Sequence, residues 1–144
     1  MEFGRQAIIL ARNLIRVGLV NSVNHSNGTV KVLFPDKDNS ISNELPLMSA
    51  EYNIPAIGEQ VLCLFLGNGL EKGFCLGSFY SDITLPPIAN KNIYRKQFDD
   101  GTYIEYNKSS KTLQVISNSP ITLNGNVKIE GNLEITGTVS ASNI

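Results

Sequence analysis

Side chains that could carry catalysis are few in this chain of 144 residues, and their spacing suits no reaction. His25 is the single histidine and stands beside Ser26 in a predicted turn, where no third group can orient it as a base. The carboxylates of Asp36, Asp38 and Glu44 share one polar loop, but they lack the ligand order of a calcium loop. We therefore expect that the protein is not an enzyme and holds no metal.

Two further segments have the composition of binding loops, and each has a simpler explanation. Asp99-Asp100-Gly101 is typical of a β-turn, and Gly67-Asn68-Gly69 lacks the lysine and helix that follow a phosphate-binding loop. Cys63 and Cys75 both lie in apolar segments, which favours buried reduced thiols over a disulfide and indicates a chain made in a reducing cytoplasm. We expect no cofactor.

The composition narrows the class of partner. The chain has 12 basic and 13 acidic residues, whereas proteins that bind nucleic acid usually carry a basic excess. Charged residues are 17% of the sequence, below the roughly 25% of an average soluble domain, and this favours β structure with contacts between chains. No apolar run reaches the length of a membrane span, and the first residues lack the layout of a signal peptide.

The elements that must position these residues begin with a single helix, predicted over residues 1–17 with its regular part at 5–17. Gly18 is its expected cap, and Arg16 lies in the favourable last turn. We expect this helix to pack on the strands that follow or to dock into a partner. Its apolar stripe consists of Ala7, Ile8, Ala11, Leu14 and Ile15.

Short strands account for residues 18–82. Asn27-Gly28 between two apolar runs predicts a hairpin, and residues 36–44 read as a polar loop. Residues 61–66 are apolar on both faces, which suits a barrel strand covered from both sides. Five short strands without a second helix predict a small closed barrel, for which an OB-fold is the natural candidate.

Residues 83–98 are predicted to be an extended linker, because Pro86-Pro87 enforces an extended path. A hairpin with strands at 102–106 and 112–116 follows, and it opens the last segment, 99–144. The protein is thus expected to be mainly β, with a helix, a barrel and a C-terminal β segment.

The C-terminal tail alternates strictly. Every odd position from 121 to 141 is apolar or glycine, and every even position between them is polar, which is the period of a β-strand. The glycines recur every six residues, where we expect tight turns, at Gly125, Gly131 and Gly137. The expected core of the tail consists of Ile121, Leu123, Val127, Ile129, Leu133, Ile135 and Val139.

Such a tail needs partner strands, and no sequence remains to supply them. Identical strands wound around a symmetry axis would give an intertwined β-helix or β-prism, and we expect a homotrimer. A tail without structure is the alternative, but disorder would not maintain strict alternation.

Four blocks and the tail together resemble a known family. The blocks are GTVKVLFP (28–35), PAIGEQVLCLF (55–65), GFCLGSFY (73–80) and DDGTYIEY (99–106). In order and spacing they are similar to the baseplate spike, or baseplate assembly protein V, family of contractile-tailed phages and phage-tail-like bacteriocins, which is related to VgrG proteins.

The resemblance implies an OB-fold collar on a trimeric β-helical needle. It also implies a baseplate hub as partner on the N-terminal side, transient contact with the target cell envelope during puncture, and a place in a virion tail or tail-like particle assembled in the bacterial cytoplasm. The chain lacks the paired histidines that bind iron in some relatives, and the linker has no room for their lysozyme domain. We expect a PAAR-like tip protein at residues 137–144, or else Ile144 from three chains closing the axis.

An OB-fold module that binds oligonucleotides or another ligand, with a trimerising tail, is the alternative function. It would need aromatic and basic side chains interleaved on an exposed face. Phe34, Phe65, Phe74 and Phe79 stand among aliphatic residues, so we expect them in the core and expect no nucleic acid as partner.

Overall fold

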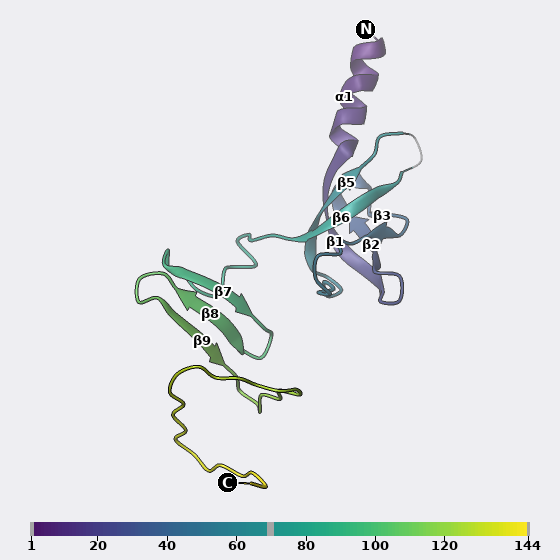
Figure 1. The fold of residues 1–144 in the computed structure, drawn as a ribbon. Helices are drawn as coiled ribbons and strands as arrows, with labels where there is room; N and C mark the ends of the chain where they lie inside the picture. The colour runs from purple at the N-terminus through teal and green to yellow at the C-terminus, as the bar shows by residue number, and fades with distance from the viewer. Residues whose placement is uncertain (1, 69–70, 144) are drawn as a thin grey trace. The chain divides into compact units, whose positions relative to one another are not determined.

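The protein is mainly β with one N-terminal helix, as the computed structural model shows for residues 2–68 and 71–143 (Figure 1). The chain divides into two units, Met1–Pro86 and Pro87–Ile144, and each contains its own antiparallel sheet. Within the described residues, no helix is both long and apolar enough to cross a membrane.

Helix α1 (Glu2–Leu14) runs directly into strand β1 (Ile15–Asn24), so it begins and ends earlier than the predicted 5–17. Gly18 is therefore a residue of β1 and not a helix cap. A Cβ atom at Gly18 would lie 2.5 Å from the carbonyl oxygen of Leu33 on the neighbouring strand, so glycine is needed for close approach.

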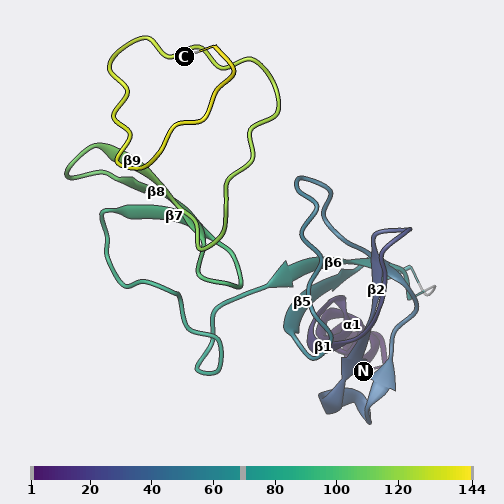
Figure 2. The same cartoon turned by 90° about the horizontal axis from the view of Figure 1, so that it is seen from below.

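Six strands form the sheet of the first unit, in the order β3-β2-β1-β5-β6, with β4 also paired to β2. Leu47, just after β4, forms a parallel bridge with Cys75 of β6. The segment 45–47 therefore joins β2 to β6, and the sheet curls around a core (Figure 2). Beside β1, the strands are β2 (Thr29–Phe34), β3 (Ser40–Ile41), β4 (Leu45–Pro46), β5 (Gln60–Phe65) and β6 (Gly73–Ser78).

The predicted hairpin at Asn27-Gly28 is confirmed. β1 and β2 pair antiparallel up to Asn24 and Thr29, and Gly28 has a φ of +66°. The Asn24 side chain holds the turn by accepting a hydrogen bond from the backbone N–H of Asn27 at 3.1 Å. The predicted polar loop 36–44 is interrupted by a short 3₁₀ helix (Pro35–Lys37) and by β3.

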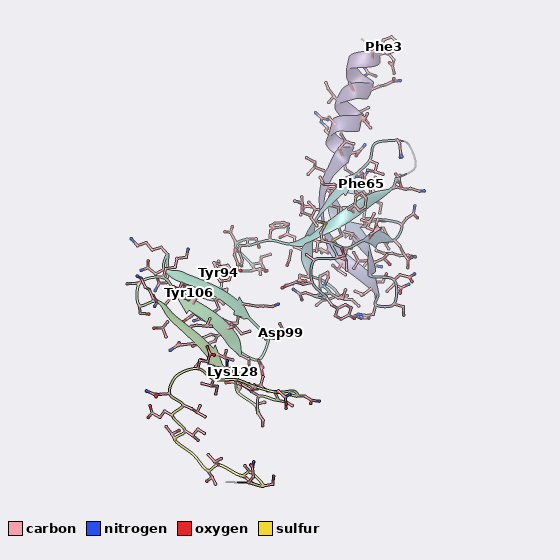
Figure 3. All side chains as sticks on the ribbon, viewed as in Figure 1. Phe3, Phe65, Tyr94, Asp99, Tyr106 and Lys128 are labelled. Atoms are coloured by element: carbon pink, nitrogen blue, oxygen red, sulfur yellow. The ribbon has the colours of Figure 1, made fainter. Side chains whose placement is uncertain are left out.

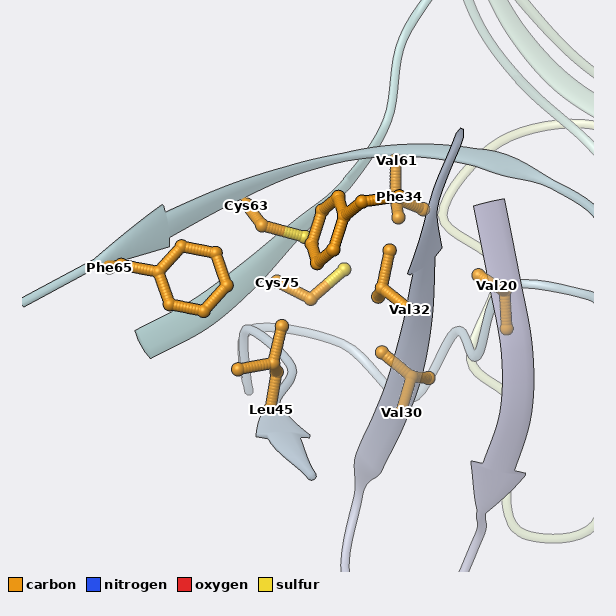
Figure 4. Close-up of a cluster of buried hydrophobic side chains, with 9 residues drawn as sticks. All are labelled: Val20, Val30, Val32, Phe34, Leu45, Val61, Cys63, Phe65 and Cys75. Atoms are coloured by element: carbon orange, nitrogen blue, oxygen red, sulfur yellow. The ribbon is translucent and has the colours of Figure 1, made fainter. Parts of the chain in front are cut away.

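The core of the first unit lies inside the curled sheet (Figure 4). Phe34 and Phe65 meet edge to face at 6.0 Å between ring centroids, as expected of core residues. Phe74 and Phe79 are 43% and 36% exposed, so their prediction as core residues is wrong. The alternation of a β-strand explains why Phe74 is exposed. The residues on either side of it in β6, Gly73 and Cys75, are buried, so the side chain of Phe74 lies on the outer face. The buried residues are Val20, Val30, Val32, Phe34, Leu45, Val61, Cys63, Phe65 and Cys75.

Arg16 joins the end of α1 to this core. Its guanidinium carbon lies 4.1 Å from the ring centroid of Phe65 and 5.5 Å from that of Phe34. Its Nε donates a hydrogen bond of 2.9 Å to the carbonyl oxygen of Asn13 in the last turn of the helix. One side chain thus closes the core and satisfies a terminal helix carbonyl.

The sheet of the second unit consists of β7 (Ile93–Gln97), β8 (Tyr103–Asn107) and β9 (Thr112–Ile116), paired in that order. The predicted hairpin is confirmed as β8 and β9. Residues 93–97 form β7, so the expected linker 83–98 is wrong over these five positions.

An ion pair between Arg95 on β7 and Glu105 on β8 lies on one face of this sheet. Their side chains are only 15% and 11% exposed, and Arg95 Nε donates to Glu105 Oε1 at 2.8 Å. The guanidinium also lies 3.9 Å from the ring centroid of Tyr103. Because Arg95 and Glu105 are opposed in the strand register, their ion pair fixes β7 against β8.

We predict that Arg95→Ala lowers the free energy of unfolding by about 3 kcal/mol, because it leaves the Glu105 carboxylate nearly buried without its cation. Urea denaturation at fixed protein concentration, followed by circular dichroism, measures the change. Lys128→Ala is the control, since its ion pair with Glu130 is 82% and 76% exposed and contributes at most about 1 kcal/mol. Equal effects of the two substitutions would contradict this account of Arg95.

Candidate functional site

One face of the β7–β8–β9 sheet carries apolar side chains that remain exposed in the single chain. Tyr94 and Leu113 both pair with Tyr106 in the register, and they are 73% and 68% exposed. Ile104 opposes Val115 on the same face. We call this surface the apolar sheet face; it consists of Tyr94, Ile104, Tyr106, Leu113 and Val115. Figure 3 labels Tyr94 and Tyr106 on neighbouring strands of this sheet. The opposite face holds the ion pair of Arg95 and Glu105.

The tail after β9 presents a second apolar surface. Residues 117–143 contain no strand, and they trace an open curve in the second unit (Figure 2). The seven residues predicted as the tail core are all at least half exposed: Ile121, Leu123, Val127, Ile129, Leu133, Ile135 and Val139. Within one chain the structure therefore brings none of them into a core.

The three tail glycines all lie at bends of the backbone. Gly125 and Gly131 have φ angles of +144° and +143°, which side-chain-bearing residues rarely adopt, whereas Gly137 has no such angle. A Cβ atom at any of the three would meet no atom within 4 Å. In the single chain, backbone conformation rather than crowding explains glycine at 125 and 131.

The start of the tail is tied to the sheet. The backbone N–H of Asn118 donates to Thr102 Oγ1 at 3.4 Å, and its side chain donates to the carbonyl oxygen of Asp100. Leu113 and Val115 occupy odd positions, as do the apolar residues of the tail. The alternation of β9 is thus resumed at Ile121, after four residues of which Asn118 is bound to the turn between β7 and β8.

Of the residues with potential for catalysis, His25, Ser26 and Glu44 line one cavity of about 460 Å³, and Asp36 and Asp38 are not among its lining residues. His25 is exposed in the β1–β2 turn, and Asp36 and Asp38 are exposed as well. Glu44 is exposed too, and its Oε1 accepts a hydrogen bond of 3.2 Å from Asn24 Nδ2. Among the described residues, no three His, Cys, Asp or Glu side chains gather where they could hold a metal ion.

The predicted turn at Asp99-Asp100-Gly101 is confirmed. Asp100 Oδ1 accepts a hydrogen bond of 2.9 Å from the backbone N–H of Thr102, and this bond lowers the pKa of the Asp100 carboxyl. The glycine-rich turn that includes Gly69 lies partly outside the described residues.

The outer surface of the first unit is a site that sequence reasoning missed. Ile15, Leu64 and Phe74 are neighbours across β1, β5 and β6, and they are 63%, 37% and 43% exposed. The sequence signal was the run 61–66 with apolar residues on both faces, of which only the inner face is covered within the chain. Within the single chain this outer surface is an exposed apolar patch, as the apolar residues of the tail are.

Helix α1 is also largely uncovered. Phe3 and Ile8 are 86% and 54% exposed, and no described residue of the helix is buried. The helix meets the rest of the unit through Leu10 and Leu14, which lie beside Gly67. The expected packing of its stripe on the strands is therefore limited to its last turns.

A cavity of about 610 Å³ opens beside β6 in the first unit. Lys31 and Lys72 line it with Phe74, but Glu44 and Glu71 lie there too. The mixed charge gives no stripe of positive potential along which a phosphate backbone could bind.

Comparison with known proteins shows similarity to a phage spike protein. No protein-family model matches the chain. The chain is 29% identical over 122 residues to the spike protein of Escherichia phage P2, and the alignment covers 81% of this chain. The chain corresponds to about 57% of the length of that relative.

We predict that Gly131→Ala lowers the thermal midpoint of the protein, because alanine at a φ of +143° is strained by about 1–3 kcal/mol. Gly137→Ala is the matched control in the next repeat and should lower the midpoint much less. Differential scanning calorimetry at one protein concentration measures both. Two equal shifts would show that crowding between chains, and not φ, sets the need for glycine.

Proposed function

We propose that the protein is a structural spike of a contractile-tail baseplate, in which a barrel collar carries a trimeric needle that punctures the target cell envelope. The observation that carries this proposal is the tail, whose alternating apolar residues are exposed and whose backbone pairs with no strand across residues 121–143. Similarity to the spike protein of phage P2 supports it, as does the mainly β fold.

We assign the first unit to the OB-fold class. Its support is the path of the sheet, in which β1 pairs with both β2 and β5, and the segment 45–47 joins β2 to β6. The parallel bridge from Leu47 to Cys75, in an otherwise antiparallel sheet, is what closes the path. A closed five-stranded path of this kind suits an OB-type barrel.

Three chains are the smallest assembly in which each tail can pair its backbone on both edges and cover its apolar residues. Strands wound around a common axis need a neighbour on both edges, and two copies cannot form a closed ring, whereas three can. The odd residues would then face the axis, and the apolar sheet face would be covered by the neighbouring copies. Polar even residues, such as the exposed pair Lys128 and Glu130, would face water.

A needle of this kind suits puncture for a physical reason. In a closed ring every backbone N–H and C=O is paired, so no strand can slide without breaking bonds to two neighbours. The shaft would transmit the force of sheath contraction without fraying. The protein would then be a component of a phage tail or tail-like particle that contacts the cell envelope only during puncture. The expected tip partner stays a prediction.

The baseplate hub is the partner we propose for α1. The helix is amphipathic, its residues Phe3 and Ile8 are exposed, and Arg16 fixes its last turn on the barrel core. An anchored helix with an uncovered apolar stripe suits docking into a groove of another protein. Oligonucleotide binding remains the alternative, and the cavity offers it Phe74 and two lysines, but the two glutamates beside them oppose it.

We predict a homotrimer of the full chain by multi-angle light scattering. Ile135→Asp should reduce the trimer fraction at least tenfold, because three carboxylates would be buried on the axis. Thr136→Asp, one residue further on the polar face, should leave the mass unchanged. A folded monomer of the unaltered chain at micromolar concentration would rule out the proposed needle.

We predict that Ile8→Asp reduces incorporation of the spike into particles, while the mass of the free trimer stays the same. The carboxylate would disrupt the exposed apolar stripe without touching the contact of Leu10 and Leu14 with the barrel. Gln6→Asp is the control on the opposite side of the helix. Quantitative immunoblotting of purified particles measures incorporation, and normal yield with Ile8→Asp would contradict docking through α1.

A further inference from the structure

Two thiols face one another in the core of the first unit. Cys63 on β5 and Cys75 on β6 are partners in the antiparallel register, and both are free and fully buried. Figure 4 shows their side chains entering the core from neighbouring strands. The two thiols are close enough for each to change the pKa of the other.

A bulge creates this pairing. Leu62 opposes Gly77, but the next residue, Cys63, opposes Cys75, so Leu76 is an extra residue on β6. Gly77 has a φ of +108°, which accommodates the irregularity. In a regular ladder Cys63 would face Leu76 instead. The local irregularity of the sheet therefore brings the two cysteines opposite each other.

The spacing of the strands suits a disulfide. Directly opposed residues of an antiparallel pair have Cα atoms about 4.5–5.5 Å apart. Disulfides span Cα separations of about 4.4–6.8 Å, so the usual spacing of opposed residues is compatible with a bond between these two cysteines.

The pair is also asymmetric in acidity. The hydrogen bond from Cys63 lowers the pKa of Cys75, while the same bond, together with burial, raises the pKa of Cys63. Because Cys75 also lies on β6, the last strand of the sheet path, we assign the attack to Cys75 and the resolving step to Cys63.

We propose that Cys63 and Cys75 are an oxidisable pair, reduced when the chain folds and converted to a cross-strand disulfide by exchange with a low-molecular-weight disulfide. The Cys75 thiolate attacks one sulfur of the small disulfide and releases the other half as a thiolate. Cys63 then loses its proton and attacks the Cys75 sulfur, releasing the second thiolate. Two protein thiols are oxidised to one disulfide, and one small disulfide is reduced to two thiols.

The sheet provides a route for the oxidant. β6 is the last strand of the sheet path, and on its far side the structure records a single bridge, from Leu47 to Cys75. Opening of this edge exposes Cys75 without unfolding β1, β2 or β5. β6 also leads along the chain into the second unit, so the bond would anchor the strand from which that unit extends. This mechanical role rests on the proposed function, whereas the oxidation itself does not.

The test is a redox titration of the full chain in mixtures of oxidised and reduced glutathione, in buffer and in urea. Samples that start oxidised and samples that start reduced must reach the same fraction of disulfide. This requirement ensures that slow access of glutathione to the buried thiols is not mistaken for an unfavourable equilibrium. Alkylation and intact mass then give the fraction of chains that have lost two hydrogen atoms. We expect the native pair to form the disulfide with an equilibrium constant about tenfold or more above that in urea.

Thermal unfolding provides a linked readout, because a bond favoured by the native state must raise the thermal midpoint of the oxidised protein. Cys63→Ala and Cys75→Ala should each yield mixed disulfides at most. A native equilibrium constant equal to or below that in urea, or a lower midpoint after oxidation, would overturn the proposal. Light scattering of the same samples measures the oligomeric mass, which we expect to be the same in the oxidised and reduced protein. Failure of the disulfide and failure of the trimer can therefore be told apart.

Discussion

An alternating strand has to cover its apolar face and pair its backbone, and the C-terminal tail of this protein meets neither need within one chain. Its apolar residues from Ile121 to Val139 are at least half exposed, and residues 121–143 contain no strand. The apolar sheet face and the outer surface around Leu64 share this condition. The exposed apolar area is therefore a property of both units, and it makes association the central feature of the proposed function.

Each unit places a half-buried arginine over aromatic rings. Arg16 lies over the rings of Phe65 and Phe34 at one end of the first core, and Arg95 lies over Tyr103 in the second unit. Each guanidinium has a hydrogen-bond acceptor as well, the Asn13 carbonyl or the Glu105 carboxylate. Because arginine stays charged and planar, it can stack on a ring and donate hydrogen bonds at once. In the first unit this fixes the direction of α1, and in the second it fixes the register of β7 and β8.

The sequence predicted an element correctly where the element depends on residues close together in the chain. The Asn27-Gly28 hairpin, the β8–β9 hairpin and the Asp100 turn depend on residues within a few positions, and all three are confirmed. The helix ends three residues before the predicted position, because its end depends on Arg16 and on the pairing of β1 with β5. The periodicity of the sequence does not reveal either contact. β7 was missed for the same reason, since Tyr94 and Arg95 are recognisable as strand residues only beside β8.

The sequence by itself determined the alternation of the tail and the period of its glycines, because these are patterns along the chain. Only the tertiary structure decided which apolar residues are covered: Phe34 and Phe65 are, whereas Phe74 and Phe79 are not. It also decided that Cys63 faces Cys75, through a bulge at Leu76 that no residue pattern indicated. The physical reason is that burial and strand register are set by contacts between segments distant in sequence, which composition and spacing do not specify.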